Sequence, residues 1–325
     1  MTVEVNEMTM KMIMDLDTGV DDALALAYAL SFEEVELIGV TTSFGNVTLE
    51  NATKNTINLL DLLGHSHIPV FEGASSPWGE TSYEPQPHLL RIHGENGIGN
   101  VDLGEPQRQP SKQCAVDFII ESANKFGKEL ILYTAGPMNN LADAIKKDKE
   151  AIEKIGKIVS MGGALTVPGN VSPYAEANIH RDPKSAQYVF DSDIPMTLVG
   201  LDVTLKTMIK GTDISSWHPI GTTASDAMVE LANYYYTNEF DDADIGGAMH
   251  DPLAVEVALN PSIVTQSTKI NLKVETEGEA KGRTIGNLDL LNRQFKSMTV
   301  CLDVDSVLFT QRFIERMQHI LSQGD

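Results

Sequence analysis

The chain has 325 residues, of which 46 are acidic and 24 are basic, so its formal net charge at pH 7 is −22. This excess of negative charge argues against binding to nucleic acids or anionic membranes, because both require a basic surface. A chain of this length can bury a large core and is within reach of a single α/β domain. The composition therefore favours a neutral small molecule as the partner.

The cysteines and the N-terminal residues both indicate a cytoplasmic protein. Cys114 and Cys301 are the only cysteines and lie far apart in the sequence. Two buried free thiols are expected rather than a disulfide, which suits a reducing compartment. Residues 1–7 are acidic and lack the apolar core of a signal peptide. No run of about 18 apolar residues occurs, so the sequence predicts no membrane span.

The first predicted elements enclose a cluster of carboxylates. Residues 12–14 predict a short buried strand, and residues 23–30 predict a helix that is apolar on nearly all sides. Between them stand Asp15, Asp17, Asp21 and Asp22. One aspartate at the start of a helix is commonly an N-cap, but capping does not account for all four. Because like charges repel, the cluster predicts a bound cation, and oxygen ligands suit Ca²⁺ or Mg²⁺ rather than zinc.

Strands and helices then alternate along the chain. Residues 35–42 and 68–71 predict strands on either side of a helix at 50–63. This alternation predicts a mainly parallel sheet with helices on both faces. Asn46 follows the strand at 35–42, and ligands of such sheets bind beyond the carboxyl ends of the strands. The segment 72–110 is rich in Gly, Pro and Ser and predicts a long irregular loop.

The remainder of the chain continues this pattern, without internal repeats or linkers, so a single domain over residues 1–325 is predicted. Further strands are expected at 129–134, 157–161, 194–199, 269–275 and 298–302. Further helices are expected at 111–126, from 182 onward, at 204–210, at 225–240, from 252 onward, and as a closing helix that runs through 321. The helix at 225–240 carries Tyr234, Tyr235 and Tyr236, of which at most one or two can face a pocket.

The octet at 15–22, Asp-x-Asp-x-Gly-x-Asp-Asp, resembles the signature of the inosine-uridine-preferring nucleoside hydrolases. Other segments resemble motifs of that family and occur in the expected order: Gly45-Asn46-Val47, His93-Gly94-Glu95-Asn96-Gly97-Ile98-Gly99, Ala135-Gly136-Pro137, Met161-Gly162-Gly163, Asn170, Glu176-Ala177-Asn178, His250-Asp251-Pro252 and Gly282-Arg283-Thr284. The chain departs from the family at Asn96 and Asn287, where Asp is more usual, and at Met138 and Asn139, where the family has Leu-Thr.

The resemblance implies a single α/β domain with a mainly parallel, open, Rossmann-like sheet flanked by helices. Its site would lie at the carboxyl ends of the strands. The implied activity is Ca²⁺-dependent hydrolysis of the N-glycosidic bond of ribonucleosides such as inosine, uridine or cytidine, in nucleoside salvage or catabolism. Family members are commonly homodimers or homotetramers, so the same is expected here.

The resemblance also assigns roles to individual residues. The residues expected to bind Ca²⁺ are Asp17, Asp22, Asp251 and, through its backbone carbonyl, Ala135. Asp17 would also take a proton from the attacking water, and His250 would protonate the leaving base, since imidazole titrates near neutrality. The residues expected to contact substrate are Asp21, Asn46, His93, Met161, Asn170, Glu176, Asn178 and Asp251.

Two functions from other classes remain open at this stage. A Mg²⁺-dependent phosphohydrolase would use Asp15 as its nucleophile, but it needs a phosphate-binding Lys or Ser after a later strand, and no convincing one is present. A non-catalytic calcium- or sugar-binding protein would use the same acidic pocket but would not need His250 beside Asp251. The sequence leaves the preferred base, the tyrosine that contacts it and the oligomeric state undecided.

Overall fold

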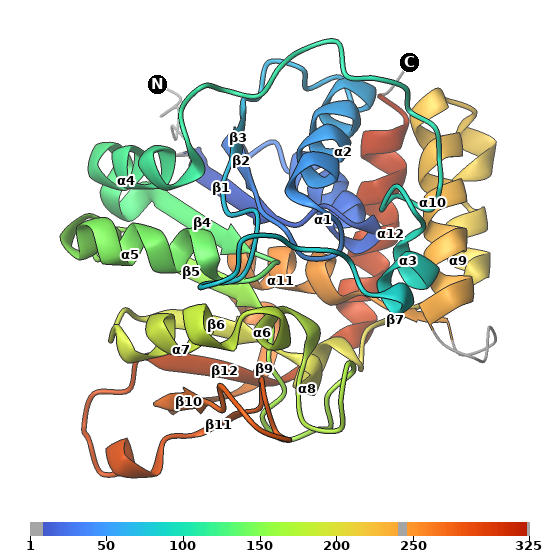
Figure 1. Cartoon of the computed structure of the whole chain (residues 1–325). Helices are drawn as coiled ribbons and strands as arrows, with labels where there is room; N and C mark the ends of the chain where they lie inside the picture. The colour runs from blue at the N-terminus through green and yellow to red at the C-terminus, as the bar shows by residue number, and fades with distance from the viewer. Residues whose placement is uncertain (1–8, 240–245, 324–325) are drawn as a thin grey trace, which may run out of the picture.

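An eight-stranded sheet runs through the molecule and has helices on both faces (Figure 1). The computed structural model describes residues 9–239 and 246–323. In order across the sheet, the strands are β3 (Val70–Glu72), β2 (Val35–Thr42), β1 (Met10–Leu16), β4 (Leu130–Thr134), β5 (Lys157–Met161), β6 (Met196–Val199), β12 (Met298–Val304) and β9 (Val264–Ile270). Neighbouring strands are parallel except β12 and β9. The single-domain α/β fold with a mainly parallel sheet is therefore confirmed.

The helices bury an apolar core on each face of the sheet. One core is formed mainly with α1 (Val20–Leu30), α2 (Leu49–Leu62), α10 (Thr223–Glu239), α11 (His250–Leu259) and α12 (Ser306–Leu321). The other is formed mainly with α4 (Ala115–Phe126), α5 (Asn139–Ile152) and α7 (Pro183–Asp191). Each large apolar side chain buried in this way contributes about 1.5–3 kcal/mol to folding.

Shorter elements complete the fold. They are the helices α3 (Pro87–His93), α6 (Ala177–Arg181), α8 (Leu201–Thr204) and α9 (Gly211–Ser215), with the paired strands β7 (Met208–Ile209) and β8 (Gly247–Ala248), and β10 (Leu272–Val274) and β11 (Thr284–Gly286). Several of them lie close to the carboxyl ends of the main strands, so they supply much of the cavity described below.

The strand order places a crevice in the middle of the sheet. β1 pairs with β2 on one side and with β4 on the other. From β1 the chain therefore builds the sheet in one direction and, from β4 onward, in the opposite direction. The connections that follow β1 and β4 run away from each other, so a crevice remains at the carboxyl ends of these two strands. Open α/β sheets bind ligands in such a crevice.

Two predicted helices differ from the observed ones. The helix expected at 204–210 is absent, because α8 ends at Thr204 and Met208 and Ile209 instead pair with residues 247–248 as β7. The helix expected from 111 begins at Ala115, since the backbone N–H of Ser111 donates to the carbonyl of Val70 at the edge of the sheet. In both places a long-range backbone pairing overrides the local helical pattern.

The long loop and the cysteines also differ from expectation. The segment 72–110 contains one helix, α3, whose Pro87 stands in the first turn, as proline favours. Cys301 is buried as expected, whereas Cys114 is exposed at the start of α4. Phe240, the last residue of the helix predicted at 225–240, lies outside the described residues.

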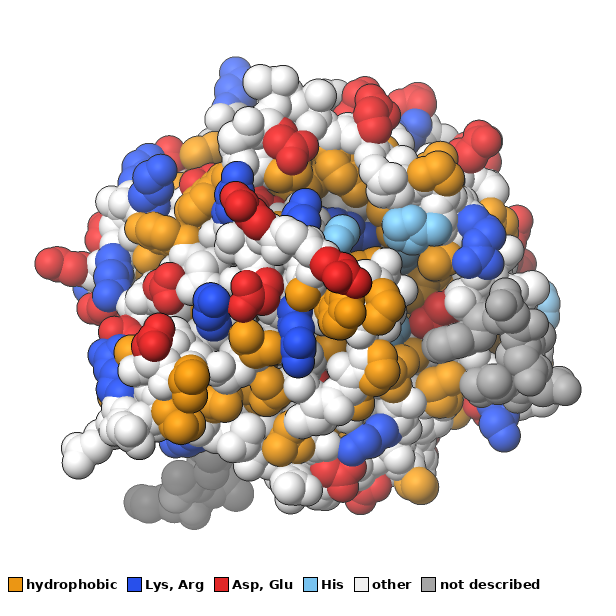
Figure 2. Space-filling model, turned by 60° about the horizontal axis from the view of Figure 1, so that its bottom comes forward, with side chains coloured by type: hydrophobic (Ala, Val, Ile, Leu, Met, Phe, Trp, Pro, Cys, Tyr) orange, Lys and Arg blue, Asp and Glu red, His pale blue; other side chains and the backbone are white. Residues whose placement is uncertain are grey.

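The distribution of charge on the surface agrees with the prediction that the partner is a neutral small molecule. On the face drawn in Figure 2, acidic and basic side chains are interspersed and form no large continuous basic area. Within residues 9–239 and 246–323, no helix is both long and apolar enough to cross a membrane.

Candidate functional site

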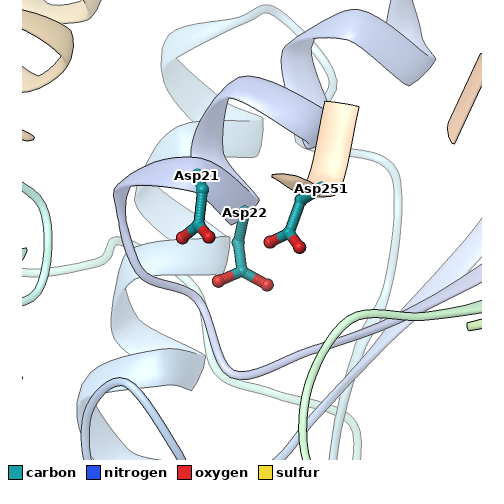
Figure 3. A group of neighbouring side chains, drawn as sticks. All are labelled: Asp21, Asp22 and Asp251. Atoms are coloured by element: carbon teal, nitrogen blue, oxygen red, sulfur yellow. The ribbon is translucent and has the colours of Figure 1, made fainter. Parts of the chain in front are cut away.

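Three carboxylates meet at the crevice between β1 and β4. Asp21 and Asp22 lie in the first turn of α1, and Asp251 lies in the first turn of α11. Oxygen atoms of the three side chains lie within 4.8 Å of one another, and the carboxylates converge on one space in Figure 3. Asp21 Oδ1, Asp22 Oδ1 and Asp251 Oδ2 are buried and have no hydrogen-bond partner among the described residues. Buried unpaired carboxylate oxygens are costly unless a cation binds them.

Burial raises the pKa of all three groups, and the neighbouring carboxylates add to the effect at Asp22 and Asp251. The pKa of Asp22 and that of Asp251 lie well above the ordinary value. Each ionised carboxylate repels the charge of the next and so disfavours its ionisation. A cation that binds here offsets this repulsion and stabilises the ionised forms. An acidic group that can hold a metal is therefore present, and oxygen donors alone suit a hard cation.

Asp17 lies beside this group and is fully paired. Its Oδ2 accepts from the backbone N–H of Asn46 at 2.7 Å and from Nη1 of Arg181 at 3.1 Å, and its Oδ1 accepts from Nδ2 of Asn46 at 3.1 Å. Burial raises the pKa of Asp17 to about 7, although Arg181 lowers it in part. The same amide of Asn46 donates to Asp22 Oδ2 at 3.1 Å, so it links Asp17 to the acidic group.

The turn between β1 and α1 requires glycine. The backbone N–H of Gly19 donates to Asp22 Oδ2 at 2.8 Å at the start of α1. A Cβ at this position would lie 2.6 Å from Nδ1 of His93 and 2.8 Å from Nδ2 of Asn46. Gly19 therefore allows two candidate site residues from other segments to approach α1 closely.

Glu176 and Asn178 form a second polar group, at the start of α6. The carboxylate of Glu176 accepts from the backbone N–H groups of Gly163 at 2.9 Å, Asn178 at 2.8 Å and Ile179 at 3.1 Å, so it caps α6. Asn178 Nδ2 donates to the carbonyl of Met161 at 3.3 Å. These contacts hold the end of β5, the glycine turn after it and α6 in one arrangement.

His93 is buried, although a histidine in a long loop would ordinarily be exposed. Its Nδ1 accepts from the backbone N–H of Val20 at 3.3 Å and lies 3.9 Å from Asp21 Oδ1. Burial lowers the pKa of His93 to about 3, so the ring is neutral. Its ring centroid lies 5.2 Å from that of Tyr235. Among the three consecutive tyrosines, Tyr235 is therefore the one that lines the site.

His250 is held by two side chains. Its Nδ1 lies 2.8 Å from Oγ1 of Thr204, and its Nε2 lies 3.1 Å from Oε1 of Glu239. Burial lowers its pKa, but the bond to Glu239 and the nearby negative charges raise it by more, so the net shift is upward. This is the direction that a group which donates a proton near neutral pH requires.

These side chains surround one cavity of about 320 Å³. The predicted residues that line it are Asp21, Asn46, His93, Ala135, Met161, Asn170, Glu176, Asn178 and His250. Asp17, Asp22 and Asp251 are almost fully buried behind this lining. The volume lies at the lower end of the range of small-molecule sites, which is about 300–1,000 Å³.

The structure adds two charged residues to the site, Arg181 and Glu239. Arg181 follows Asn178 by three residues, a spacing that places both on one side of a helix, but the short α6 was not predicted. Glu239 stands at the end of α10, and no motif marks it.

Three other polar residues have structural roles. Asp15 accepts from Oγ1 of Thr41 at 2.6 Å and from Nδ2 of Asn140 at 2.7 Å, and burial raises its pKa to about 6. Asn140 therefore joins the ends of β1 and β2, since its Nδ2 also donates to the carbonyl of Thr42 at 3.1 Å. Asn96 donates to the carbonyl of Val101 at 2.8 Å and accepts from two backbone N–H groups of its own loop. The amide of Asn96 therefore finds both a hydrogen-bond acceptor and donors within its own loop.

Comparison with known proteins agrees with the geometry. Residues 12–311 match the model of the family described as inosine-uridine preferring nucleoside hydrolase. A solved structure, the purine-preferring ribonucleoside hydrolase from Gardnerella vaginalis, is 43% identical and superimposes with a TM-score of 0.93, covering 96% of this chain and 99% of that one.

Curated relatives carry related names. The pyrimidine-specific ribonucleoside hydrolase RihA of Salmonella gallinarum is 34% identical, over 96% of this chain and 99% of the relative. Uridine nucleosidase 1 of Arabidopsis thaliana is 34% identical, over 85% of this chain and 81% of the relative. The chain belongs to the nucleoside hydrolase family. It is an N-glycosyl hydrolase that acts on ribonucleosides, and this replaces the phosphohydrolase and the non-catalytic binding protein considered above.

Proposed function

We propose that this enzyme hydrolyses ribonucleosides such as inosine, uridine and cytidine to the free base and ribose with Ca²⁺ as its cofactor, in nucleoside salvage or catabolism. The observation that carries the proposal is the group of three buried carboxylates, Asp21, Asp22 and Asp251, whose unpaired oxygens face one another beside a cavity of substrate size.

The donors in this group favour calcium. Carboxylate and carbonyl oxygens without sulfur or imidazole ligands suit a hard cation, and Ca²⁺ accepts irregular sets of six to eight oxygens more readily than Mg²⁺. Asp17, Asp22, Asp251 and the Ala135 carbonyl are the proposed ligands, with Asp21 close enough to share in them. When bound, the cation would lower the pKa of a water molecule and hold the 2′- and 3′-hydroxyls of the ribose.

Asp17 is the proposed proton acceptor. A cation bound beside Asp17 would keep this carboxylate ionised at neutral pH, as a proton acceptor must be. Its hydrogen bonds to Asn46 fix its orientation. A general base of this kind contributes about 10²–10⁴-fold to the rate.

The remaining polar residues are proposed to bind the ribose and the base. Asn46, Asn170, Glu176 and Asn178, with Asp21, offer the mixed donors and acceptors that a hydroxyl-rich ligand needs, and Met161 lines the same wall. The negative charge of Asp21 and Glu176 would also favour the positive charge that develops at C1′. At the other end, His93 and Tyr235 are proposed to contact the base, and His250 to protonate it as it leaves.

Ribose release tests the proposal. The purified enzyme is assayed with inosine, guanosine, uridine and cytidine, then after EDTA, and again after Ca²⁺ is restored. We expect free ribose that disappears with EDTA and returns with Ca²⁺, and the four rates rank the bases. Restoration by Mg²⁺ or Zn²⁺ but not by Ca²⁺ would contradict the assigned metal, and activity that persists without any metal would contradict the site.

The homodimeric or homotetrameric state and the cytoplasmic location are further predictions. Size-exclusion chromatography with light scattering tests the first, and fractionation of cells that produce the protein tests the second.

A further inference from the structure

Arg181 is the charged residue of the site to which the mechanism above gives no role. It is the last residue of α6, and its side chain is 8% exposed. It lines the cavity together with Asn46 and Asn178. A guanidinium at this depth is stable only when its charge and its N–H groups are paired.

One guanidinium group contacts three candidate site residues. Nη1 donates to Asp17 Oδ2 at 3.1 Å and to Asn178 Oδ1 at 2.7 Å, and Nη2 donates to Asn46 Oδ1 at 2.6 Å. Asp17 follows β1, Asn46 follows β2 and Asn178 lies in α6, so the contacts join three separate segments. Only the planar, forked guanidinium offers several donors in fixed directions, which a lysine ammonium does not.

The contacts also determine which way the amide of Asn46 points. Its Oδ1 accepts from Arg181, while its Nδ2 donates to Asp17 and Asp22. If the amide rotated by half a turn, its oxygen would face two carboxylates and its NH₂ would face a guanidinium. Arg181 therefore favours the single orientation in which Asn46 supports Asp17.

The charge of Arg181 persists in this environment. Burial lowers its pKa, but Asp17, Tyr83, Glu176 and Asp21 raise it, and the net shift is upward. The guanidinium is thus a permanent donor to Asp17. The carboxylate of Asp17 has this positive charge on one side and the acidic group of Asp21, Asp22 and Asp251 on the other.

We infer that Arg181 is a positioning residue of the hydrolysis: it holds the carboxylate of Asp17 and the amides of Asn46 and Asn178 in their working arrangement. The inference rests on the proposed function, in which Asp17 accepts the proton and the two amides bind ribose. A displacement of about 1 Å in such a site costs about 10²-fold in rate.

Substitution of Arg181 by Met and by Lys tests this inference. Arg181→Met keeps the length of the side chain and removes every donor, whereas Arg181→Lys keeps the charge but loses the fork. We expect kcat for ribose release to fall about 10²-fold for Arg181→Met and about 10-fold or more for Arg181→Lys, and KM to rise in both.

Arg108→Met is the matched control. Arg108 is partly buried and pairs with Asp61 through Nε at 2.8 Å, outside the cavity. Arg108→Met removes a comparable ion pair. Thermal unfolding therefore measures any loss of stability that the Arg181 and Arg108 variants share. The kcat should change only in the Arg181 variants. Wild-type kcat in folded Arg181→Met, or in Arg181→Lys if the methionine variant does not fold, would overturn the inference.

A double-mutant cycle with Asp17→Asn separates positioning from a structural role. If Arg181 acts on kcat through Asp17, removal of Arg181 from the Asp17→Asn enzyme should lower kcat little further, and multiplicative losses would contradict this. Because Asp17→Asn turns over slowly, calorimetry can also measure how tightly it binds a nucleoside. Binding should weaken when Arg181 is removed from this variant, because Asn46 and Asn178 then lose their common donor. Failure of the wild-type enzyme to release ribose would overturn the proposed function itself, whereas an active wild type with an equally active Arg181→Met would overturn only this inference.

Discussion

Burial controls the chemistry of the individual side chains in this site. It raises the pKa of Asp17 to about 7 and lowers that of His93 to about 3. Without metal, the first group therefore takes up a proton near neutral pH, and the second remains a neutral ring that accepts a hydrogen bond from the backbone of α1. The same physical cause makes one side chain a candidate base and the other a fixed contact surface.

Asp17→Asn tests the proton acceptor. An amide cannot accept a proton, so kcat for ribose release should fall about 10²–10⁴-fold, while circular dichroism and thermal unfolding should show a folded protein. Asp61→Asn removes a carboxylate that pairs with Arg108 away from the cavity and should leave kcat unchanged. Near-wild-type turnover by Asp17→Asn would refute the assignment.

His250→Gln tests the proton donor. With a nucleoside substrate, loss of the imidazole should lower kcat by about 10²-fold or more, because the leaving base no longer gains a proton in the transition state. With 4-nitrophenyl ribofuranoside, whose nitrophenolate departs as a stable anion, kcat should change little. The two rates are measured by ribose release and by absorbance, and an equal loss with both substrates would argue against the role of His250 as an acid.

At the level of elements, the turn after β2 approaches the end of β1 very closely. A Cβ at Gly45 would lie 1.8 Å from Asp17 Oδ2 and 2.6 Å from its Cγ. No side chain fits between these two segments, so the position of Asp17 depends on this contact between neighbouring strands as well as on its own turn.

Gly45→Ala should therefore displace Asp17. We expect kcat to fall about 10²-fold, with a smaller effect on the midpoint of thermal unfolding. Gly211→Ala is the control, because a Cβ there would have no heavy atom within 4 Å. If both variants kept the wild-type rate, the close approach would not constrain the catalytic geometry.

Three helices that support the site meet at one buried carboxylate. Glu256 of α11 is fully buried and accepts from the hydroxyl of Tyr28 in α1 at 2.7 Å and from Nη1 of Arg312 in α12 at 2.7 Å. The contact lies in the later turns of α1 and α11, whose first turns carry Asp22 and Asp251, so it joins the two helices away from the acidic group.

Glu256→Gln should destabilise the fold. An amide leaves either Tyr28 or Arg312 without its acceptor, so the free energy of unfolding should fall by about 2 kcal/mol. Urea unfolding measures the change, with the exposed Glu315→Gln as control. The kcat of the folded variant should remain near that of wild type, and unchanged stability would contradict this role of Glu256.

At the level of the whole molecule, the buried acidic residues link stability to pH and to metal. In the folded protein the pKa values of Asp15 and Asp17 are about 6 and about 7, against 3.8 in the unfolded chain. The folded state therefore binds protons more tightly between these values. This contribution to stability is complete below about pH 4 and is lost as the pH rises through 7.

Without metal, the free energy of unfolding should thus fall from about pH 6.5 to about pH 8, by on the order of 1 kcal/mol. Below about pH 6.5 the low pKa of His93 acts in the opposite direction, because the unfolded chain then binds a proton that the folded protein does not. Calcium at 100 times its Kd should add about 2.7 kcal/mol. At a fixed calcium concentration the gain should be larger at the higher pH, where the carboxylates are ionised and bind the cation more tightly. Urea unfolding with EDTA and with Ca²⁺ measures both effects. A stability that rises with pH between about 6.5 and 8 in EDTA would contradict the pKa shifts.

The sequence by itself determined the α/β class, the mainly parallel sheet and the family, because these depend on local patterns. The strand, turn and helix that carry Asp17, Asp21 and Asp22 are adjacent in the chain, so their spacing alone predicts a cluster of carboxylates. The same holds for Glu176 and Asn178, which stand in one motif.

Only the tertiary structure decided how these motifs combine. Arg181 is 164 residues from the Asp17 that it contacts, and Glu239 meets His250 across a segment with no motif. The start of α4 and the strand β7 were decided by backbone pairing with distant residues. Such contacts depend on which strands become neighbours in the sheet. The pattern of residues along the chain does not show which single residues this brings together. The sequence therefore identified the chemical groups, and the fold determined which of them share a proton, a charge or a hydrogen bond.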